Sequence, residues 1–120
     1  MLRPTRPVLV VEDHERTQAA IERLLHLRGY TVVKVANRHD ALAYFRGGGS
    51  ACLIVLDAIM PEMDGEAFRE RQLADPALAR IPVVVFSGHP SATPLPGAGF
   101  VRKTDPDGLL NFVEQHALAN

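Results

Sequence analysis

Cys52-Leu53-Ile54-Val55-Leu56-Asp57 is an unbroken apolar run that ends in an aspartate. Four other short runs are similarly rich in valine, isoleucine and leucine, and most of them lack alternating polar residues: Val8–Val11, Tyr30–Val35, Ile81–Phe86 and Phe100–Val101. Strands that are covered by helices on both faces have this composition, whereas a strand with one solvated face alternates. The five runs therefore predict a buried parallel β-sheet.

Helical patterns separate the apolar runs. Apolar residues recur at three- to four-residue spacing in four segments: His14–Arg28, Arg38–Arg46, Asp64–Leu73 and Asp105–Leu118. Gly29 is a helix stop after the first segment, and Gly47–Ser50 is a flexible turn after the second. This alternation predicts an α/β fold with right-handed crossovers. We expect a single doubly wound, five-stranded parallel sheet of the flavodoxin-like kind, with strand order 2-1-3-4-5.

The composition limits what the chain can be. Its 120 residues fit one domain, residues 1–120, and 47% are hydrophobic, so a packed core is expected. The net charge of −1 gives no general attraction to nucleic acid or to a membrane. Cys52 is the single cysteine, which excludes an internal disulfide, and we expect it to be a small buried residue. The first apolar run is too short for a signal peptide or a membrane span, so we expect a cytoplasmic protein.

Polar residues follow four of the predicted strands at the point where each strand ends. They are Glu12 and Asp13 after the first strand, Asp57 after the third, Ser87 after the fourth and Lys103 after the fifth. In the expected order the first and third strands are neighbours at the switch point, where ligands bind. Three crowded carboxylates repel one another, and Mg²⁺, which prefers oxygen ligands, would relieve that repulsion. The sequence has no cysteine or histidine cluster, so zinc and copper are not expected.

An aspartate can act as a nucleophile and form an acyl phosphate. Asp57 ends a strand at the switch point, which makes it the natural site of attack on phosphorus. Phosphoryl transfer requires charge neutralisation in the transition state, which Mg²⁺ and Lys103 would supply, while the Ser87 hydroxyl would donate to a phosphoryl oxygen. Taken singly, each residue is an ordinary helix cap, turn residue or surface lysine. Their conjunction at four strand ends points to a phosphoaspartate site.

These residues resemble those of the receiver domain of two-component response regulators, and the resemblance covers nearly the whole chain. Its most specific part is Leu53–Gly65, a strand that ends in the phosphoacceptor and is followed by Met-Pro and Met-Asp-Gly. Glu12-Asp13 resembles the acidic pair of that family. Phe86-Ser87-Gly88 resembles its switch hydroxyl, and Phe100-Val101-Arg102-Lys103 resembles its last strand with an aromatic residue and a lysine.

The resemblance implies a role for each matched residue. Asp57 would accept the phosphoryl group, and Ser87 and Lys103 would contact it. Asp13, Asp57 and the Ile59 carbonyl would bind Mg²⁺ directly, with Mn²⁺ as a substitute, and Glu12 would hold metal-bound water. Phe100 would be the aromatic switch that turns inward with Ser87; a plain core residue is an equally weighted interpretation. The donor would be a phosphohistidine on a histidine kinase or a phosphotransfer protein, and the output would go to a downstream protein effector.

Two departures from the family pattern stand out. Thr104 follows the lysine where the family has a proline after a cis peptide, and a cis bond before a non-proline residue is costly, so we expect a trans bond. The connection between Ser87 and Phe100 includes Pro90, Pro94, Pro96, Gly97 and Gly99. These residues predict that the fourth helix of the family is missing or shortened. The departure weakens the resemblance for the output surface that includes this helix, but not for phosphorylation.

Three alternatives to a phosphoacceptor domain remain open from the residues. The first is an interaction module with the same fold that is never phosphorylated; the acidic residues argue against it, and Thr104 and the lost helix argue mildly for it. The second is a phosphatase of the haloacid dehalogenase kind, but Ile59 occupies the position of its general acid. A nucleotide-binding enzyme is the third, and the phosphate-binding loop Gly-x-x-x-x-Gly-Lys-Ser/Thr is absent. We therefore expect a signalling domain that catalyses only its own phosphorylation and dephosphorylation.

Overall fold

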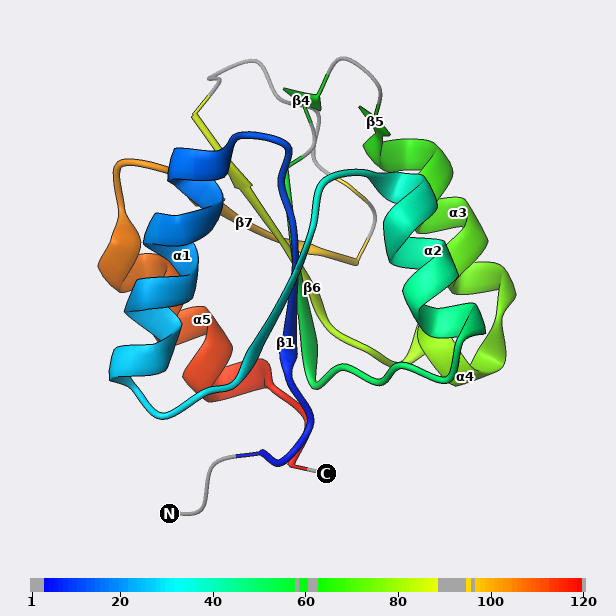
Figure 1. The fold of residues 1–120 in the computed structure, drawn as a ribbon, viewed down its shortest axis with the longest axis horizontal. Helices are drawn as coiled ribbons and strands as arrows, with labels where there is room; N and C mark the ends of the chain where they lie inside the picture. The colour runs from blue at the N-terminus through cyan, green and yellow to red at the C-terminus, as the bar shows by residue number, and fades with distance from the viewer. Residues whose placement is uncertain (1–3, 58, 61–62, 89–94, 96, 120) are drawn as a thin grey trace.

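The central sheet of the computed structural model has five parallel strands (Figure 1). The structure describes residues 4–57, 59–60, 63–88, 95 and 97–119. The strands of the sheet are β1 (Val8–Val11), β2 (Val32–Val35), β3 (Leu53–Leu56), β6 (Val83–Ser87) and β7 (Gly99–Arg102). Their order is β2-β1-β3-β6-β7, and all four pairings are parallel. The predicted order of the flavodoxin-like fold is therefore confirmed.

Helices cover both faces of the sheet, as the apolar strands predicted. Figure 1 shows α1 (Glu15–Leu27) and α5 (Pro106–His116) on one side, and α2 (Arg38–Arg46), α3 (Gly65–Ala74) and α4 (Pro76–Ala79) on the other. Successive strand residues point to opposite faces, so β1 contributes Val8 and Val10 to one core and Leu9 and Val11 to the other. Every residue of β1 and β3 is buried.

Three small elements after β3, two strands and a short helix, were not predicted. β4 (Ile59–Met60) and β5 (Met63–Asp64) form a two-residue antiparallel pair near the carboxyl end of the sheet. Helix α4 follows α3 closely. The Asp75 side chain caps α4 by accepting from the Ala77 amide, and Pro76 occupies the first turn, where its missing N–H costs nothing.

The connection from β6 to β7 falls only partly within the described residues. The prediction that the fourth helix of the family is missing or shortened concerns mainly residues 89–94 and 96, which lie outside them. Gly88, Leu95, Gly97 and Ala98 are described, and none of these four is helical. Leu95 is buried against the core on the α2 and α3 side.

Three further expectations concern single features of the chain. Cys52 is a free, fully buried thiol in the core, as expected. No cis peptide bond occurs in the described residues, so the bond between Lys103 and Thr104 is trans, as expected. Within the described part of the chain, no helix has the length and apolar character needed to cross a membrane.

Candidate functional site

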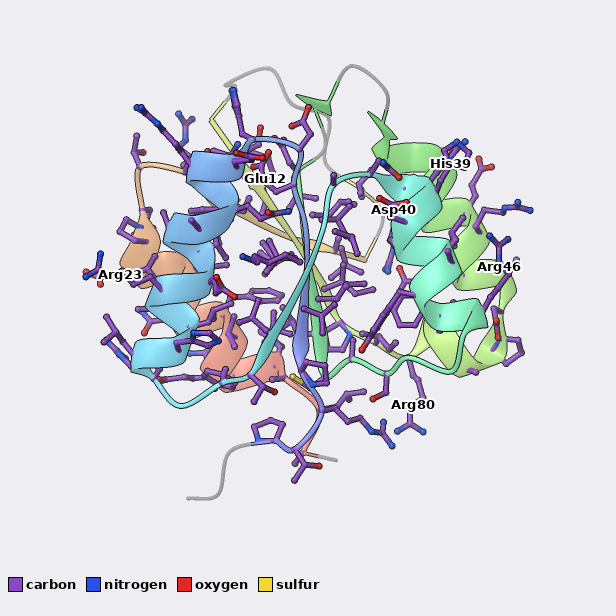
Figure 2. All side chains as sticks on the ribbon, viewed as in Figure 1. Glu12, Arg23, His39, Asp40, Arg46 and Arg80 are labelled. Atoms are coloured by element: carbon purple, nitrogen blue, oxygen red, sulfur yellow. The ribbon has the colours of Figure 1, made fainter. Side chains whose placement is uncertain are left out.

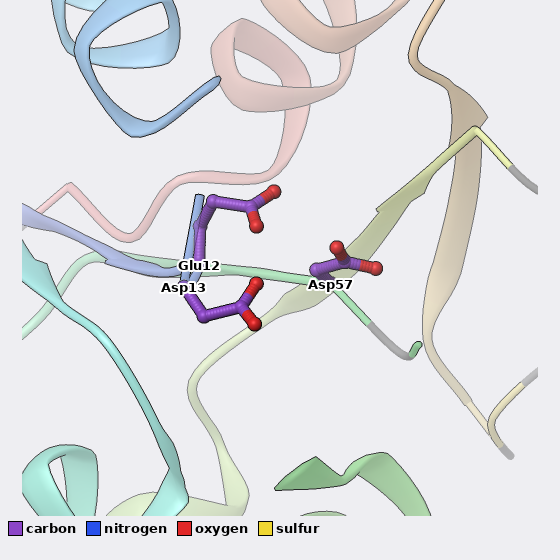
Figure 3. A group of neighbouring side chains, drawn as sticks. All are labelled: Glu12, Asp13 and Asp57. Carbon is purple, nitrogen blue, oxygen red and sulfur yellow. The ribbon is translucent and has the colours of Figure 1, made fainter. Parts of the chain in front are cut away.

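Three carboxylates meet at the carboxyl end of the sheet, where β1 and β3 lie side by side (Figure 3). Glu12 and Asp13 follow β1, and Asp57 follows β3. Each offers an oxygen, and these oxygens lie within 4.8 Å of one another. The parallel register sets this proximity: Val11 pairs with Leu56, and the Asp57 amide donates to the Val11 carbonyl at 3.1 Å. The predicted convergence of Asp13 and Asp57 is therefore present.

Lys103 bridges two of the three acids. Its Nζ lies 2.8 Å from Glu12 Oε1 and 3.0 Å from Asp57 Oδ2. The lysine reaches the acids from the loop after β7, where its amide donates to the Ser87 carbonyl at 3.0 Å. The side chains of Glu12 and Asp57 are 2% and 8% exposed, so this ammonium compensates charge on two buried carboxylates.

The ionisation of the site follows from burial and from these contacts. Burial raises the pKa of the Glu12 carboxyl, against hydrogen bonds from Lys103 and the His14 amide that lower it. Burial alone would lower the pKa of Lys103, but its hydrogen bonds and its charge attraction to Glu12 and Asp57 together outweigh that effect, so the pKa is raised. Lys103 therefore stays charged at neutral pH. With all four groups ionised, three carboxylates and one ammonium leave a local charge of −2 (1 − 3).

The donor set fits a hard divalent cation. It consists of carboxylate oxygens, and no histidine or cysteine belongs to this cluster. Mg²⁺ takes one or two carboxylates and keeps several waters, which requires access to solvent. Asp13 is exposed while Glu12 and Asp57 are buried, so the cluster opens to solvent on one side. The backbone of Ile59 begins β4 two residues after Asp57, close in sequence to the cluster; its predicted role as a carbonyl ligand stays a prediction.

Ser87 and Phe100 lie on the neighbouring strands β6 and β7. Ser87 is the last residue of β6 and is 2% exposed. Phe100 lies on the edge strand β7, where it pairs with Val85 of β6, and it is 40% exposed. The interpretation of Phe100 as a core residue is therefore wrong. The exposed position is compatible with an aromatic residue that has room to turn inward, and that switch stays a prediction.

Gln18 of α1 is a residue that the sequence reasoning missed. Its Nε2 donates to the Glu12 carbonyl at 3.0 Å and to the Val35 carbonyl at 3.2 Å, which joins α1 to the ends of β1 and β2. The His14 amide donates to Glu12 Oε2 at 3.1 Å. Gln18 shares a helix face with buried Ile21 and Leu25. A polar residue on an otherwise apolar face was the available signal.

Known proteins resemble the chain in sequence and in structure. The model of the family described as "Response regulator receiver domain" matches residues 8–98. The sensor kinase CckA of Brucella abortus is 36% identical over 91 residues, which are 74% of this chain and 10% of that protein. The chain thus spans a small part of that curated relative.

Two solved structures have the same architecture over almost their full length. The receiver domain of the hybrid histidine kinase CckA is 31% identical, with a TM-score of 0.76 over 92% of this chain and 97% of that one. The receiver domain of a signal transduction histidine kinase from Syntrophus aciditrophicus is 27% identical, with a TM-score of 0.78 over 92% of this chain and 89% of that one.

Proposed function

This chain belongs to the response regulator receiver domain family, a signalling family of two-component systems, and from that premise we propose that Asp57 accepts a phosphoryl group from a phosphohistidine. The observation that carries the proposal is the cluster of three carboxylates, two of them bound to Lys103, at the end of β1 and β3. The chemistry is a self-modification that changes partner binding, not turnover of a released substrate.

The transfer exchanges one bond to phosphorus for another. A carboxylate oxygen of Asp57 attacks phosphorus and forms an O–P bond, while the N–P bond of phosphohistidine breaks and its electron pair returns to the imidazole nitrogen. Lys103 already contacts Asp57, so its ammonium is positioned to neutralise charge on a phosphoryl oxygen. Ser87, at the end of β6, would donate its hydroxyl proton to another phosphoryl oxygen. Attack of water on phosphorus would later release phosphate and restore Asp57.

A bound Mg²⁺ would be held by Asp13, Asp57 and the Ile59 carbonyl, with Glu12 holding a metal-bound water; Mn²⁺ would serve as a substitute. When bound, it supplies positive charge to the transferring phosphoryl group. The oxygen-only donors and the charge of −2 support this assignment. We propose the cytoplasm as the location, a histidine kinase or a histidine phosphotransfer protein as the donor, and a downstream protein as the effector.

Incubation with phosphoramidate and Mg²⁺, followed by intact-mass spectrometry, tests the proposal. We expect a mass gain of one phosphoryl group that EDTA prevents and that Asp57→Asn abolishes. Asp107→Asn is the matched control, because Asp107 is an exposed acid in the first turn of α5. Absence of a mass gain with phosphoramidate and with a phosphorylated histidine kinase, in protein that remains folded by circular dichroism, would refute the assignment of Asp57.

A further inference from the structure

A cavity of about 570 Å³ lies at the edge of the sheet opposite the acids. Its walls come from the end of α2, the glycine turn that follows it, and the region of α3 and α4. Ala51, which precedes β3, and Ile81, which precedes β6, also line it. A cavity of this volume falls within the size range of small-molecule sites, roughly 300–1,000 Å³.

Four arginines line this cavity: Arg6, Arg46, Arg71 and Arg80. Figure 2 shows Arg46 at the end of α2 and Arg80 below α4. Within the described part of the chain, none of the four is in an ion pair or a side-chain hydrogen bond. Asp75 is the one acid in the lining, and it caps α4 through its 2.9 Å bond from the Ala77 amide. The lining therefore carries a net charge of +3 (4 − 1) in a chain whose total charge is −1.

Helix dipoles do not account for the whole cluster. Arg46 and Arg71 lie in the last turns of α2 and α3, where a cation interacts favourably with the helix C-terminus. Arg6 precedes β1, outside any helix, and is half-buried. Four like charges around one cavity repel one another unless an anion neutralises them. This repulsion is the first indication of a ligand.

The buried part of the cavity lining is apolar. Ile81 and Ala51 are buried, and Leu42, Phe45 and Leu78 are half-buried, whereas Arg46, Arg71 and Arg80 are exposed. Cations thus surround a lining that includes an aromatic ring. A ligand that fits both parts combines an anionic group with an apolar or aromatic one.

Specific hydrogen bonds hold the walls in place. Gln72 is fully buried, and its Nε2 donates to the carbonyls of Leu78 and Ile81, each at 2.9 Å. These bonds position α4 and the segment that carries Arg80. On the other wall, the Tyr44 hydroxyl donates to the Ser50 carbonyl at 2.7 Å. Both walls are therefore fixed in the absence of a ligand.

We propose that this cavity binds a small phosphate ester with an aromatic group, of the nucleotide class. The guanidinium fork matches phosphate oxygens in pairs, and several arginines can bind a diphosphate together. The Phe45 ring provides a surface against which a base can pack. A metal-free nucleoside diphosphate carries about three negative charges at neutral pH, which matches the excess charge of the cavity. The cavity is separate from the acidic cluster, so the proposal does not depend on phosphorylation of Asp57.

Titration of the ¹⁵N-labelled full chain with ADP in EDTA, followed by amide chemical shifts, tests the proposal. EDTA removes divalent cations, so the acidic cluster has no means of attracting phosphate. We expect shifts in residues 46–51 and 71–81, with a Kd below about 1 mM. Adenosine and inorganic phosphate, each offering half of the ligand, should bind at least about tenfold more weakly.

Arg46→Gln and Arg80→Gln should each weaken ADP binding about tenfold or more, because each removes a charged hydrogen-bond donor. Arg23→Gln is the matched control, because Arg23 is an exposed arginine on α1, on the opposite side of the molecule (Figure 2). The Arg23→Gln variant should bind ADP as the unchanged chain does. Asp57→Asn should also bind ADP normally, which separates this test from that of the acceptor.

Three results would overturn the proposal. The first is the absence of shifts at the cavity up to about 1 mM ADP. The second is equal weakening by Arg23→Gln and Arg80→Gln, which would mean non-specific attraction to charge. The third is tighter binding of hexaglutamate than of ADP, which would identify the surface as a docking site for an acidic peptide.

Discussion

Replacement of Lys103 by glutamine should destabilise the metal-free protein far more than the same replacement of Lys34. Both lysines make ion pairs of similar length, since Lys34 Nζ lies 3.0 Å from Glu22 Oε1. The Lys34 pair is partly exposed on both sides, whereas Lys103 bonds two acids that are 2% and 8% exposed. Lys103→Gln therefore removes the ammonium that contacts both buried carboxylates.

The magnitude follows from the contacts that are lost. Two hydrogen bonds between charged groups are worth about 1.5–3 kcal/mol each, which sets an upper limit of about 3–6 kcal/mol. Proton uptake and water entry at the partly open cluster reduce this value, and we expect a loss of about 2–3 kcal/mol at pH 7. At about 4 °C per kcal/mol, the Tm should fall by about 8–12 °C. Lys34→Gln should cost less than about 1 kcal/mol.

Mg²⁺ should offset part of the stability that Lys103→Gln loses. The local charge changes from −2 to −3 when Lys103 loses its ammonium, so the cluster attracts a divalent cation more strongly. We expect Mg²⁺ to bind roughly tenfold more tightly to Lys103→Gln and to raise its Tm more than that of the unchanged chain.

The assays are urea unfolding, which gives the free energy of unfolding, and thermal unfolding, which gives the Tm. Both are followed by circular dichroism at pH 7, in EDTA and then in Mg²⁺, for the unchanged chain and both variants. Equal losses for the two lysine variants in EDTA would refute the account of Lys103 as the compensating charge. A smaller Mg²⁺-induced rise in Tm for Lys103→Gln than for the unchanged chain would refute the charge argument for the metal.

Three other perturbations test separate features of the fold. Burial raises the pKa of the Cys52 thiol from its ordinary value of 9.0 to about 11, so Cys52 should react slowly with a disulfide reagent at pH 8 until urea is added. Because the folded state keeps the thiol proton to a higher pH than the unfolded state does, the free energy of unfolding should fall as the pH rises from 9 toward 11. A thiol that reacts equally fast in the folded and unfolded states would contradict this. Gly99→Ala places a methyl group against the Phe112 ring and should lower the free energy of unfolding in urea by about 1–3 kcal/mol. In a double-mutant cycle, Phe112→Leu should recover part of this loss. Full additivity of the two substitutions would exclude the clash. Gln72→Leu should lower the free energy of unfolding by about 3 kcal/mol in the same assay, because it removes the two hydrogen bonds that Gln72 donates and the one that it accepts from the Arg69 guanidinium at 2.7 Å. Gln115→Leu, on the exposed face of α5, should have little effect. Similar losses for the two variants would argue against the buried network.

The predictable parts of this molecule are those in which a local pattern has a single structural solution. Val8–Val11 is apolar throughout and forms β1 with the expected bounds, and Arg38–Arg46 forms α2 with the expected bounds. Because parallel strands end at one edge of a sheet, the positions of Asp13 and Asp57 followed from the strand order alone.

The parts that were missed depend on side chains that reach between distant segments. Lys103 was expected near a phosphoryl group, but its bonds to Glu12 and Asp57 depend on the path of the loop after β7. The cavity on the opposite edge combines residues as far apart in sequence as Arg6 and Arg80, and no local pattern connects them. The β4–β5 pair was missed because two residues are too few to show a period.

Backbone bonds of Cys52 determine where the two ends of the domain leave the sheet. The Cys52 amide donates to the Pro7 carbonyl at 2.9 Å, and its carbonyl accepts from the Leu118 amide at 2.9 Å. Both flanks of the domain are thus fastened to the start of β3, while Asp57 follows its far end, about 16 Å away along an extended strand. Further polypeptide joined to either flank would emerge on the side remote from Asp57. Such a segment would leave the acidic cluster at the other end of β3 unobstructed, so the fold is compatible with further polypeptide at either terminus.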